Sequence, residues 1–468
     1  MGDLRSEIDR IYAIQKSATE RGAFLDIHKR YAALKALEKS IRNHEKDLID
    51  ALIADFNKPE LEIIETELAF VLSDLKHTIR HLKRWARPQK VKVPLYQVLN
   101  SGYIYKEPFG MALIMAPWNY PFQLILLPAL AAIAAGNAVF LRPSTKTRHT
   151  AEVTAAIFRE ALDEEQAYVL LCSSREADLL LDYKWDFIFF TGSRSVGTAV
   201  YEKAARHLTP VILELGGKSP AIVMHDADLR FAARKIAWAK MLNAGQTCVS
   251  PDYVIVHQSV KERFLALLAD EFRKSFRETD KYDRLPHVIS ESAFRRLSAM
   301  VDEARAAGNR VIECGDSLSE IKLMAPHLID IGNFRSDLEC LKEEIFGPVL
   351  PVVGYTTEDE MEAVIAENSH PLALYLFSGS IRKARKMMSR FSYGCGCINE
   401  AVIQLANPYL PFGGVGSSGL GFYHGKFGFN AFSHRKGVAE KRWGIDWPFL
   451  YRPYTERKTS AIRFFLDR

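Results

Sequence analysis

Long apolar segments and abundant cysteine are both missing from this sequence, and each absence excludes a class of protein. The longest apolar run, residues 124–135, contains Pro128 and is well short of the roughly 20 residues of a membrane-spanning helix. Residues 1–10 lack the apolar stretch of a secretory signal. Only six cysteines occur in 468 residues, too few for a disulfide scaffold. We therefore expect a cytoplasmic protein.

A large excess of charge of one sign is also missing. The net charge is +5, and the segment from residue 434 to residue 468 alone has nine Lys/Arg against four Asp/Glu. The rest of the chain is therefore balanced, which argues against nucleic acid as a partner. With 48% hydrophobic and 25% charged residues, the chain has a globular composition, and its length favours two or three lobes.

Alternating strand and helix patterns predict a parallel sheet in the first half of the chain. Residues 3–85 have helical spacing, and residues 93–107 are typical of a hairpin that turns at residues 100–102. Short apolar strands separated by helical segments are then predicted at residues 111–116, 138–141, 168–172, 187–190 and 211–215. Such a sheet binds ligands at the carboxyl ends of its strands. Residues 219–398 continue as a second mixed α/β lobe.

Cys248 is a candidate nucleophile because of its neighbours. A buried cysteine is usually just a small apolar side chain. Cys248 instead lies among small and polar residues, in Asn-Ala-Gly-Gln-Thr-Cys-Val-Ser, and a thiolate nucleophile needs such an open, polar approach.

Glu214 and Asn119 both follow predicted strands, and the sequence allows two interpretations of each. Glu214 comes after Val-Ile-Leu, where an isolated carboxylate has a raised pKa and suits a general base. A salt-bridged surface carboxylate is the alternative. The Asn119 amide either caps the following helix or donates a hydrogen bond to a developing oxyanion.

Two other patterns carry less information. The only Gly-x-Gly-x-x-Gly match, residues 414–419, is too close to the C-terminus to begin a dinucleotide-binding βαβ unit. Cys395 and Cys397 have no second Cys/His pair nearby, so we expect no metal site and interpret them as thiols packed in a strand.

The motifs together resemble the aldehyde dehydrogenase superfamily over residues 3–437. They are Ala-Pro-Trp-Asn-Tyr-Pro-Phe (116–122), Phe-Thr-Gly-Ser (190–193), Glu-Leu-Gly-Gly-Lys-Ser-Pro (214–220), Gly-Gln-Thr-Cys (245–248), Glu-Glu-Ile-Phe-Gly-Pro (343–348) and Leu-Pro-Phe-Gly-Gly (410–414). The compact chain start and residues 421–434 are most similar to the class 3 branch, which includes fatty and aromatic aldehyde dehydrogenases.

The resemblance implies an α/β fold with a Rossmann-like parallel-sheet cofactor domain, an α/β catalytic domain and a small oligomerisation hairpin. In residue numbers, the implied NAD(P)-binding domain is 1–92 with 108–213, and the catalytic domain is 214–397. Oligomerisation or bridging segments would be 93–107 and 398–432. Residues 433–468 would form a basic aromatic tail.

The resemblance also implies an NAD(P)-dependent oxidation of aldehydes, of medium or long aliphatic chain or aromatic, to carboxylic acids. Cys248 would attack the aldehyde carbon, while Asn119 and the Cys248 backbone N–H would bind the oxyanion. Hydride transfer to the nicotinamide would leave a thioester, and Glu214 would activate the water that hydrolyses it.

The cofactor residues follow from the same resemblance. Diphosphate would lie at the strand-to-helix turn that contains Gly192, Ser193 and Gly197, and the other implied contacts are Trp118, Glu344, Phe346, Arg142 and Ser144. A common Lys-Pro-Ser-Glu motif reads Arg-Pro-Ser-Thr here, at residues 142–145. The missing glutamate removes repulsion of a 2′-phosphate and Arg142 could pair with it, so NAD and NADP both stay open.

The C-terminal tail interleaves basic residues with aromatic ones such as Trp443, Trp447 and Tyr451. We expect a homodimer in which the tail packs on the partner subunit, and peripheral contact with an anionic membrane is the alternative. Two other functions stay open: a CoA-acylating dehydrogenase and a non-catalytic binding protein on the same fold. A Cys hydrolase of the papain type is disfavoured, because it needs a His base and nothing in the sequence marks one.

Overall fold

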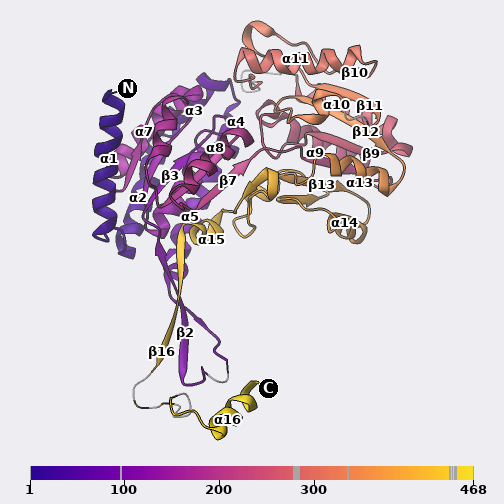
Figure 1. The fold of residues 1–468 in the computed structure, drawn as a ribbon. Helices are drawn as coiled ribbons and strands as arrows, with labels where there is room; N and C mark the ends of the chain where they lie inside the picture. Colours follow the sequence, from indigo (N-terminus) through magenta and orange to yellow (C-terminus); the bar gives the residue numbers. More distant parts are fainter. Residues whose placement is uncertain are drawn as a thin grey trace.

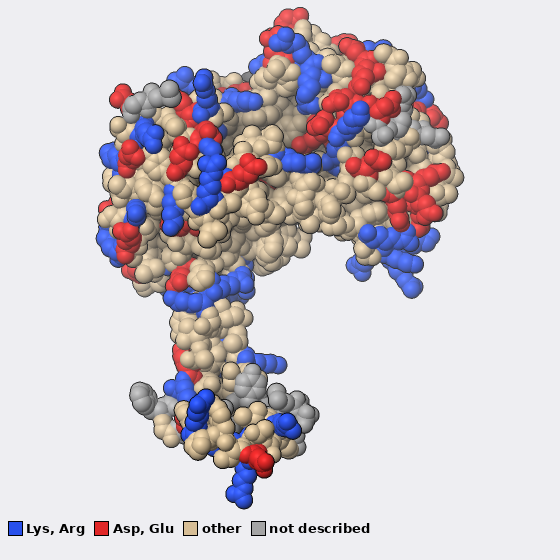
Figure 2. Space-filling model, in the orientation of Figure 1, with Lys and Arg blue, Asp and Glu red and all other residues tan. Residues whose placement is uncertain are grey.

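Two lobes lie side by side and a slender arm projects from the first of them (Figure 1). The computed structural model describes residues 2–94, 97–277, 285–334, 337–441, 444, 446 and 451–466. Lys, Arg, Asp and Glu side chains are interspersed over the visible face of both lobes (Figure 2), as the balanced charge of the body predicts.

The chain begins with the predicted helical region. Its helices are α1 (Gly2–Glu20), α2 (Ile27–Asn43), α3 (Glu45–Phe56), α4 (Glu60–Ile63), a π-helical turn (Ile64–Leu68) and α5 (Ala69–Ala86). The predicted apolar stripe of α5 is buried at Val71, Leu75 and Leu82. The helix ends before Pro88, whose ring disfavours helical backbone at the preceding Arg87.

The first lobe contains the predicted parallel sheet, in the order β15-β7-β6-β3-β4-β5. Its strands are β3 (Met111–Met115), β4 (Ala138–Arg142), β5 (Ala167–Val169), β6 (Phe187–Gly192), β7 (Val211–Leu215) and the antiparallel edge strand β15 (Gly419–Leu420). The connecting helices are α6 (Gln123–Ala135), α7 (Arg148–Ala161) and α8 (Arg194–Ala205). All five strands predicted here are confirmed, with shifts at their ends.

The second lobe is built on a seven-stranded sheet in the order β10-β11-β12-β9-β8-β13-β14. Its elements are β8 (Pro220–Val223), α9 (Leu229–Met241), β9 (Tyr253–His257), α10 (Lys261–Ser275), α11 (Glu291–Ala306), β10 (Arg310–Glu313), β11 (His327–Asn333), α12 (Glu339–Lys342), β12 (Val349–Tyr355), α13 (Glu358–Glu367), β13 (Ala373–Phe377), α14 (Ile381–Met388) and β14 (Cys395–Ile398). Because β7 continues to Leu215 in the first sheet, a domain boundary at residue 214 cuts through that strand.

The arm is a three-stranded antiparallel sheet, and the hairpin turn expected at residues 100–102 is wrong. Its strands are β1 (Gln89–Val91), β2 (Asn100–Pro108) and β16 (Ser433–Lys441). Gly102 lies inside β2, where an added Cβ would come within 2.8 Å of a methyl carbon of Val91. Glycine therefore permits close strand packing there, and the chain reverses between β1 and β2, a stretch in which residues 95 and 96 lie outside the described residues.

Segments after β14 return to the first lobe. Residues 398–432 include β15 and α15 (Gly425–Ala431), which packs against α5 and α6. The start of the expected tail, from Ser433, is β16 and pairs with all of β2. At the far end of the arm lies α16 (Glu456–Leu466) (Figure 1). Among the described residues, we find no helix with the length and apolarity needed to cross a bilayer.

Candidate active site

Cys248 lines a small, mostly apolar cavity. Helix α9 ends at Met241, and a tight turn at residues 243–245 carries the chain into the Cys248 segment. The thiol is partly exposed and lines a cavity of about 140 Å³. Its other walls include Phe70, Tyr120, Leu124, Trp238, Leu242, Val249, Val402, Ile403, Leu405, Phe412, Tyr423 and His424. A slender apolar molecule that enters the cavity therefore meets the sulfur.

The pKa of the Cys248 thiol is raised above its ordinary value, a shift that disfavours the thiolate form that a nucleophile was expected to present. Burial is the main cause that raises its pKa, and the carboxyl groups of Glu344 and Glu214 raise it further. A thiol with a raised pKa must lose its proton as it attacks.

Glu214 is an isolated carboxyl group at the end of β7. It is 3% exposed, and neither of its oxygens has a hydrogen-bond partner among the described residues. Burial raises its pKa well above the usual value. The surface salt-bridge interpretation is therefore wrong, and the group has the raised pKa expected of a general base.

Asn119 is bonded to the segment that leads to Cys248 and does not cap a helix. Helix α6 begins at Gln123 after Phe122, so Asn119 is not its capping residue. Its Nδ2 donates to the Gln246 carbonyl at 3.1 Å, and its own carbonyl accepts from Asn243 Nδ2 at 2.8 Å. An amide NH₂ has two N–H groups, so one stays available to a substrate oxygen.

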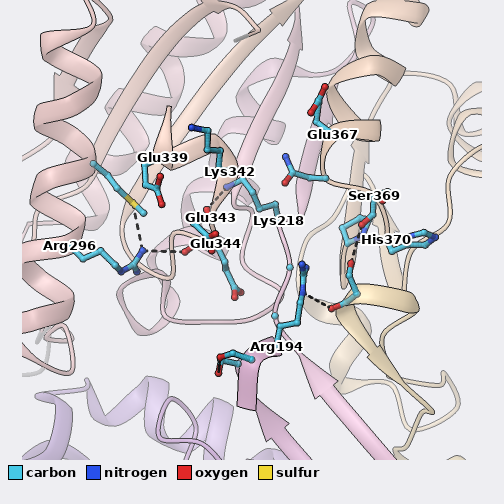
Figure 3. Close-up of a pocket in the computed structure, with 18 of the residues that line it drawn as sticks. Arg194, Lys218, Arg296, Glu339, Lys342, Glu343, Glu344, Glu367, Ser369 and His370 are labelled. Carbon is cyan, nitrogen blue, oxygen red and sulfur yellow. Dashed lines mark hydrogen bonds between the residues drawn. The ribbon is translucent and has the colours of Figure 1, made fainter. Parts of the chain in front are cut away.

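A second, larger cavity of about 1110 Å³ lies between the lobes. Figure 3 shows Arg194 on one side and Glu339, Lys342 and Glu344 on the other. Its lining includes Ser193, Arg194, Ser195, Thr198, Gly216, Gly217, Lys218, Arg296, Glu343, Glu344, Ser369 and His370. The cavity thus joins the start of α8 to the loop that contains Glu344.

The start of α8 fits a diphosphate. Ser193 precedes the helix without a side-chain hydrogen bond to its first turn, so the first backbone N–H groups remain free for an anion. A Cβ at Gly197 would come within 2.5 Å of a Leu215 methyl, and one at Gly192 within 2.6 Å of the Phe190 ring. Gly197 therefore lets α8 pack closely on β7 beside this site, whereas Gly192 leaves room for the Phe190 ring of its own strand.

Glu344 lines the opposite side of this cavity, whereas Phe346, two residues further along the same loop, is not among the described residues that line it. The Glu344 carboxyl accepts from the Gly217 backbone, and burial raises its pKa to about 8. The Phe346 ring meets the Trp118 ring edge-on at 5.4 Å. Lys218 anchors their loop by donating to the carbonyls of Cys340 and Glu343 at 2.9 Å each.

Arg142 and Ser144 lie at the carboxyl end of β4. Arg142 Nη2 donates to the Cys172 carbonyl at 3.2 Å and to Ser174 Oγ at 3.3 Å, whereas its buried Nε has no partner among the described residues. Ser144 Oγ accepts from the Lys146 backbone. Neither is among the described residues that line the inter-lobe cavity.

Cys395 and Cys397 lie in β14, as the interpretation of strand-packed thiols predicts. Cys395 Sγ contacts the Leu372 carbonyl at 3.3 Å, and Cys397 Sγ contacts Gln404 Oε1 at 2.9 Å.

Sequence reasoning missed three residues that hold the site together. Lys218 forms a buried ion pair with Asp252, and Asp252 accepts from the Ile345 backbone. The position of Lys218, directly after Gly216 and Gly217 at the end of β7, was the sequence signal that could have identified it. Glu62 accepts from the Asn243 backbone at 2.7 Å, but nothing distinguishes it among the other carboxylates of its helical region.

Comparison with known proteins agrees with this geometry. The aldehyde dehydrogenase family model matches residues 4–438. The chain is 38% identical over 444 residues to 4,4'-diaponeurosporen-aldehyde dehydrogenase of Staphylococcus aureus, covering 94% of this chain and 95% of that protein. It is 37% identical to human aldehyde dehydrogenase family 3 member B1, covering 92% of each chain.

A solved structure described as the substrate-bound state of Staphylococcus aureus AldH superposes with a TM-score of 0.93 at 36% identity, covering 98% of this chain and 99% of that one. An NAD-dependent aldehyde dehydrogenase from Sinorhizobium meliloti gives a TM-score of 0.84 at 26% identity, covering 95% and 88%. This chain is an enzyme that oxidises aldehydes with NAD or NADP, and it belongs to the aldehyde dehydrogenase family.

Proposed function

We propose that this enzyme converts apolar aldehydes to carboxylic acids through a thioester on Cys248. The observation that carries the proposal is a thiol that lines an apolar cavity and that feels the charge of Glu214, a buried carboxyl group with no partner among the described residues. Asn119, whose amide is bonded to the Gln246 carbonyl two residues before Cys248, would supply its second N–H.

The side chains divide the work between attack and hydrolysis. The Cys248 sulfur forms a bond to the aldehyde carbon, and its proton passes to solvent. The Asn119 amide and the Cys248 backbone N–H donate to the new oxyanion. After oxidation, Glu214 takes a proton from the attacking water, and the thiolate leaves as the acid forms.

The dinucleotide would be held by residues from both lobes. Ser193 and the first turn of α8 would bind its diphosphate, while Glu344 and Phe346 would bind the nicotinamide end. When bound, NAD(P) accepts the hydride from the aldehyde carbon. Arg142, with a buried Nε that has no partner among the described residues, together with Thr145 favours tolerance of a 2′-phosphate.

The substrate class follows from the walls around Cys248. Aromatic and aliphatic side chains surround the sulfur, so burial of an apolar chain supplies most of the binding energy. We infer a preference for medium- or long-chain aliphatic or aromatic aldehydes. One relative is named for a 4,4'-diaponeurosporen aldehyde.

A spectrophotometric screen tests the proposal. Aldehydes of increasing chain length are supplied with NAD or NADP, reduced cofactor is followed at 340 nm, and the product is identified with and without CoA. We expect longer chains to lower KM and the free acid to form in both cases. Formation of acyl-CoA, or no oxidation of any aldehyde, would contradict the proposal.

Asn119→Ala is expected to lower kcat about a hundredfold or more, because one oxyanion donor is lost. KM for the aldehyde should change little, since Asn119 is 3% exposed and is not among the described residues that line the substrate cavity. Steady-state kinetics of the purified variant measure both constants. A kcat within threefold of the wild type would remove Asn119 from the proposed oxyanion site.

We also propose a homodimer in the cytoplasm, with the arm at the subunit interface. The outer edges of β1 and β16 are not paired with any described strand, and β16 beyond Ser433 is exposed. An open sheet edge is a ready surface for another chain. Light scattering of the purified protein would give the mass of the assembly.

The tail past β16 allows a sharper test of membrane contact. Tyr451, Tyr454 and Phe464 are more than half exposed, while Trp443 and Trp447 lie outside the described residues. A chain that ends at Lys441 keeps β16 intact. We expect it and the full-length protein to behave alike in flotation with anionic liposomes, because the tail is proposed to pack on the partner subunit. Flotation of the full-length protein alone would support the membrane alternative.

A further inference from the structure

The turn before Cys248 is the most unusual stretch of backbone in the site. Asn243, Ala244 and Gly245 all have left-handed backbone, with φ of 51°, 52° and 74°. Left-handed backbone is unfavourable for residues with a Cβ, and several in succession persist only when surrounding contacts hold them. The position of the Cys248 backbone N–H therefore depends on those contacts.

We propose that Glu62 and Asn243 are positioning residues that hold this turn and thereby set the distance between the two oxyanion donors. Glu62 Oε1 accepts from the Asn243 backbone N–H at 2.7 Å. Asn243 Nδ2 donates to the Asn119 carbonyl at 2.8 Å and to the Gln246 carbonyl at 3.3 Å. One side chain thus joins the segment of Asn119 to the segment of Cys248.

The other side of the turn is confined by backbone. A Cβ at Gly245 would come within 2.4 Å of the Gly347 carbonyl oxygen, so the turn packs directly on the loop that contains Phe346. Gln246 also stabilises the turn, because its Nε2 donates to the Asn243 carbonyl at 3.0 Å and to the His287 carbonyl at 3.1 Å. If the hydrogen bond to Glu62 is lost, the Asn243 backbone N–H has no acceptor among the described residues, and this end of the turn is no longer held.

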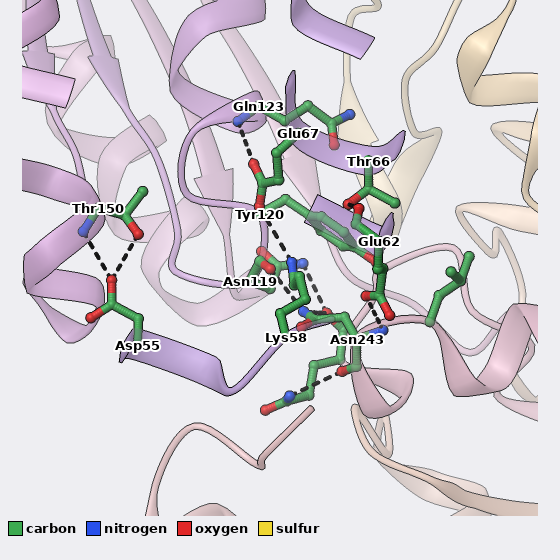
Figure 4. Close-up of polar contacts among 12 residues, drawn as sticks. Asp55, Lys58, Glu62, Thr66, Glu67, Asn119, Tyr120, Gln123, Thr150 and Asn243 are labelled. Atoms are coloured by element: carbon green, nitrogen blue, oxygen red, sulfur yellow. Dashed lines mark hydrogen bonds and ion pairs between the residues drawn. The ribbon is translucent and has the colours of Figure 1, made fainter. Parts of the chain in front are cut away.

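A buried group of charges connects Glu62 to the Asn119 segment (Figure 4). Lys58 Nζ lies 3.4 Å from Glu67 Oε1, with both side chains fully buried. Glu67 accepts from the Gln123 backbone at 2.8 Å. Lys58 also lies 4.4 Å from the centre of the Tyr120 ring, and the Tyr120 hydroxyl is 2.7 Å from Thr247 Oγ1. The segments that carry the two proposed oxyanion donors, Asn119 and the Cys248 N–H, are therefore both linked to the helical stretch that contains Lys58 and Glu67.

The charge of Glu62 is sensitive to its surroundings. Burial raises its pKa to about 7, Lys58 and the Asn243 N–H lower it, and Glu67 and Glu65 raise it. Glu62 is not among the described residues that line either cavity at the site, so it acts through the turn rather than on the substrate.

The experiment compares Glu62→Gln with Glu60→Gln, a matched change at an exposed carboxylate two residues away. We expect Glu62→Gln to lower the rate of the first turnover about tenfold or more, with little change in KM, and to weaken its pH dependence near 7. Glu60→Gln should match the wild type. Equal first-turnover rates for the two variants would overturn the proposal.

Asn243→Gly and Asn243→Ala give a second, independent measurement, which also decides the matter if Glu62→Gln does not fold. Glycine accepts the left-handed backbone but lacks the amide, so its first turnover should be slow while its melting temperature stays close to that of the wild type. Alanine should also lower the melting temperature. An Asn243→Gly enzyme with wild-type rates would contradict the proposal.

The inference rests on the proposed function of Cys248, and the two fail differently. Oxidation that survives Cys248→Ser would remove the proposed chemistry whatever Glu62 does. A dead Cys248→Ser enzyme together with a fully active Glu62→Gln enzyme would keep the chemistry and remove the positioning role.

Discussion

Cys248→Ser is expected to lower aldehyde oxidation by about ten-thousandfold or more. A hydroxyl is a much weaker nucleophile than sulfur, and removal of the covalent nucleophile is among the most damaging changes an enzyme can suffer. Steady-state oxidation followed at 340 nm measures the loss. The substitution preserves the shape of the side chain, so aldehyde binding should remain.

Cys395→Ser is the matched control for this experiment. Cys395 is also a free thiol in the second lobe, and its pKa is likewise raised by burial. It lies in β14 and is not among the described residues that line the substrate cavity. Its serine variant should keep wild-type kcat. A loss of activity in Cys395→Ser but not in Cys248→Ser would mean that Cys395, and not Cys248, is the nucleophile.

Glu214→Gln is expected to stop the reaction after hydride transfer, when the thioester has formed but is not yet hydrolysed. Without a base for water, hydrolysis of the thioester should slow about a hundredfold to ten-thousandfold. Reduced cofactor should then appear in a burst of about one equivalent per subunit, followed by a slow phase. Rapid-mixing absorbance at 340 nm separates the two phases.

The pH dependence gives a second sign of the same role. Since burial raises the pKa of Glu214 well above its usual value, the carboxylate form increases as the pH rises. Hydrolysis by the wild type should therefore accelerate with rising pH, while the slow phase of Glu214→Gln should not show that dependence. A Glu214→Gln enzyme with wild-type turnover and no burst would exclude Glu214 as the base.

The sequence was most informative where one local pattern decides the structure. The apolar stretch before Glu214 predicted β7, because a strand buried in a parallel sheet is apolar on both faces. The rule for carboxyl ends then singled out Asn119 and Glu214 as candidate site residues. Cys248 emerged from its polar neighbours and the family resemblance together.

Features that depend on distant contacts could not be predicted. Gly102 suggested a turn, but its neighbour Val91 requires a residue without a side chain inside β2. The raised pKa of Cys248 arises from burial together with Glu344 and Glu214, residues that are far apart in the chain. Glu62 holds Asn243 across 181 positions, a distance over which a helical pattern carries no information.

Mass spectrometry of the Glu214→Gln enzyme, mixed with an apolar aldehyde and NAD or NADP and quenched in acid, examines the covalent step itself. A thioester on sulfur 248 should add the mass of the acyl group to the peptide that contains Cys248 and to no other cysteine peptide. A burst of reduced cofactor with an unmodified Cys248 peptide, or an acyl group on another cysteine, would contradict the proposed thioester on Cys248.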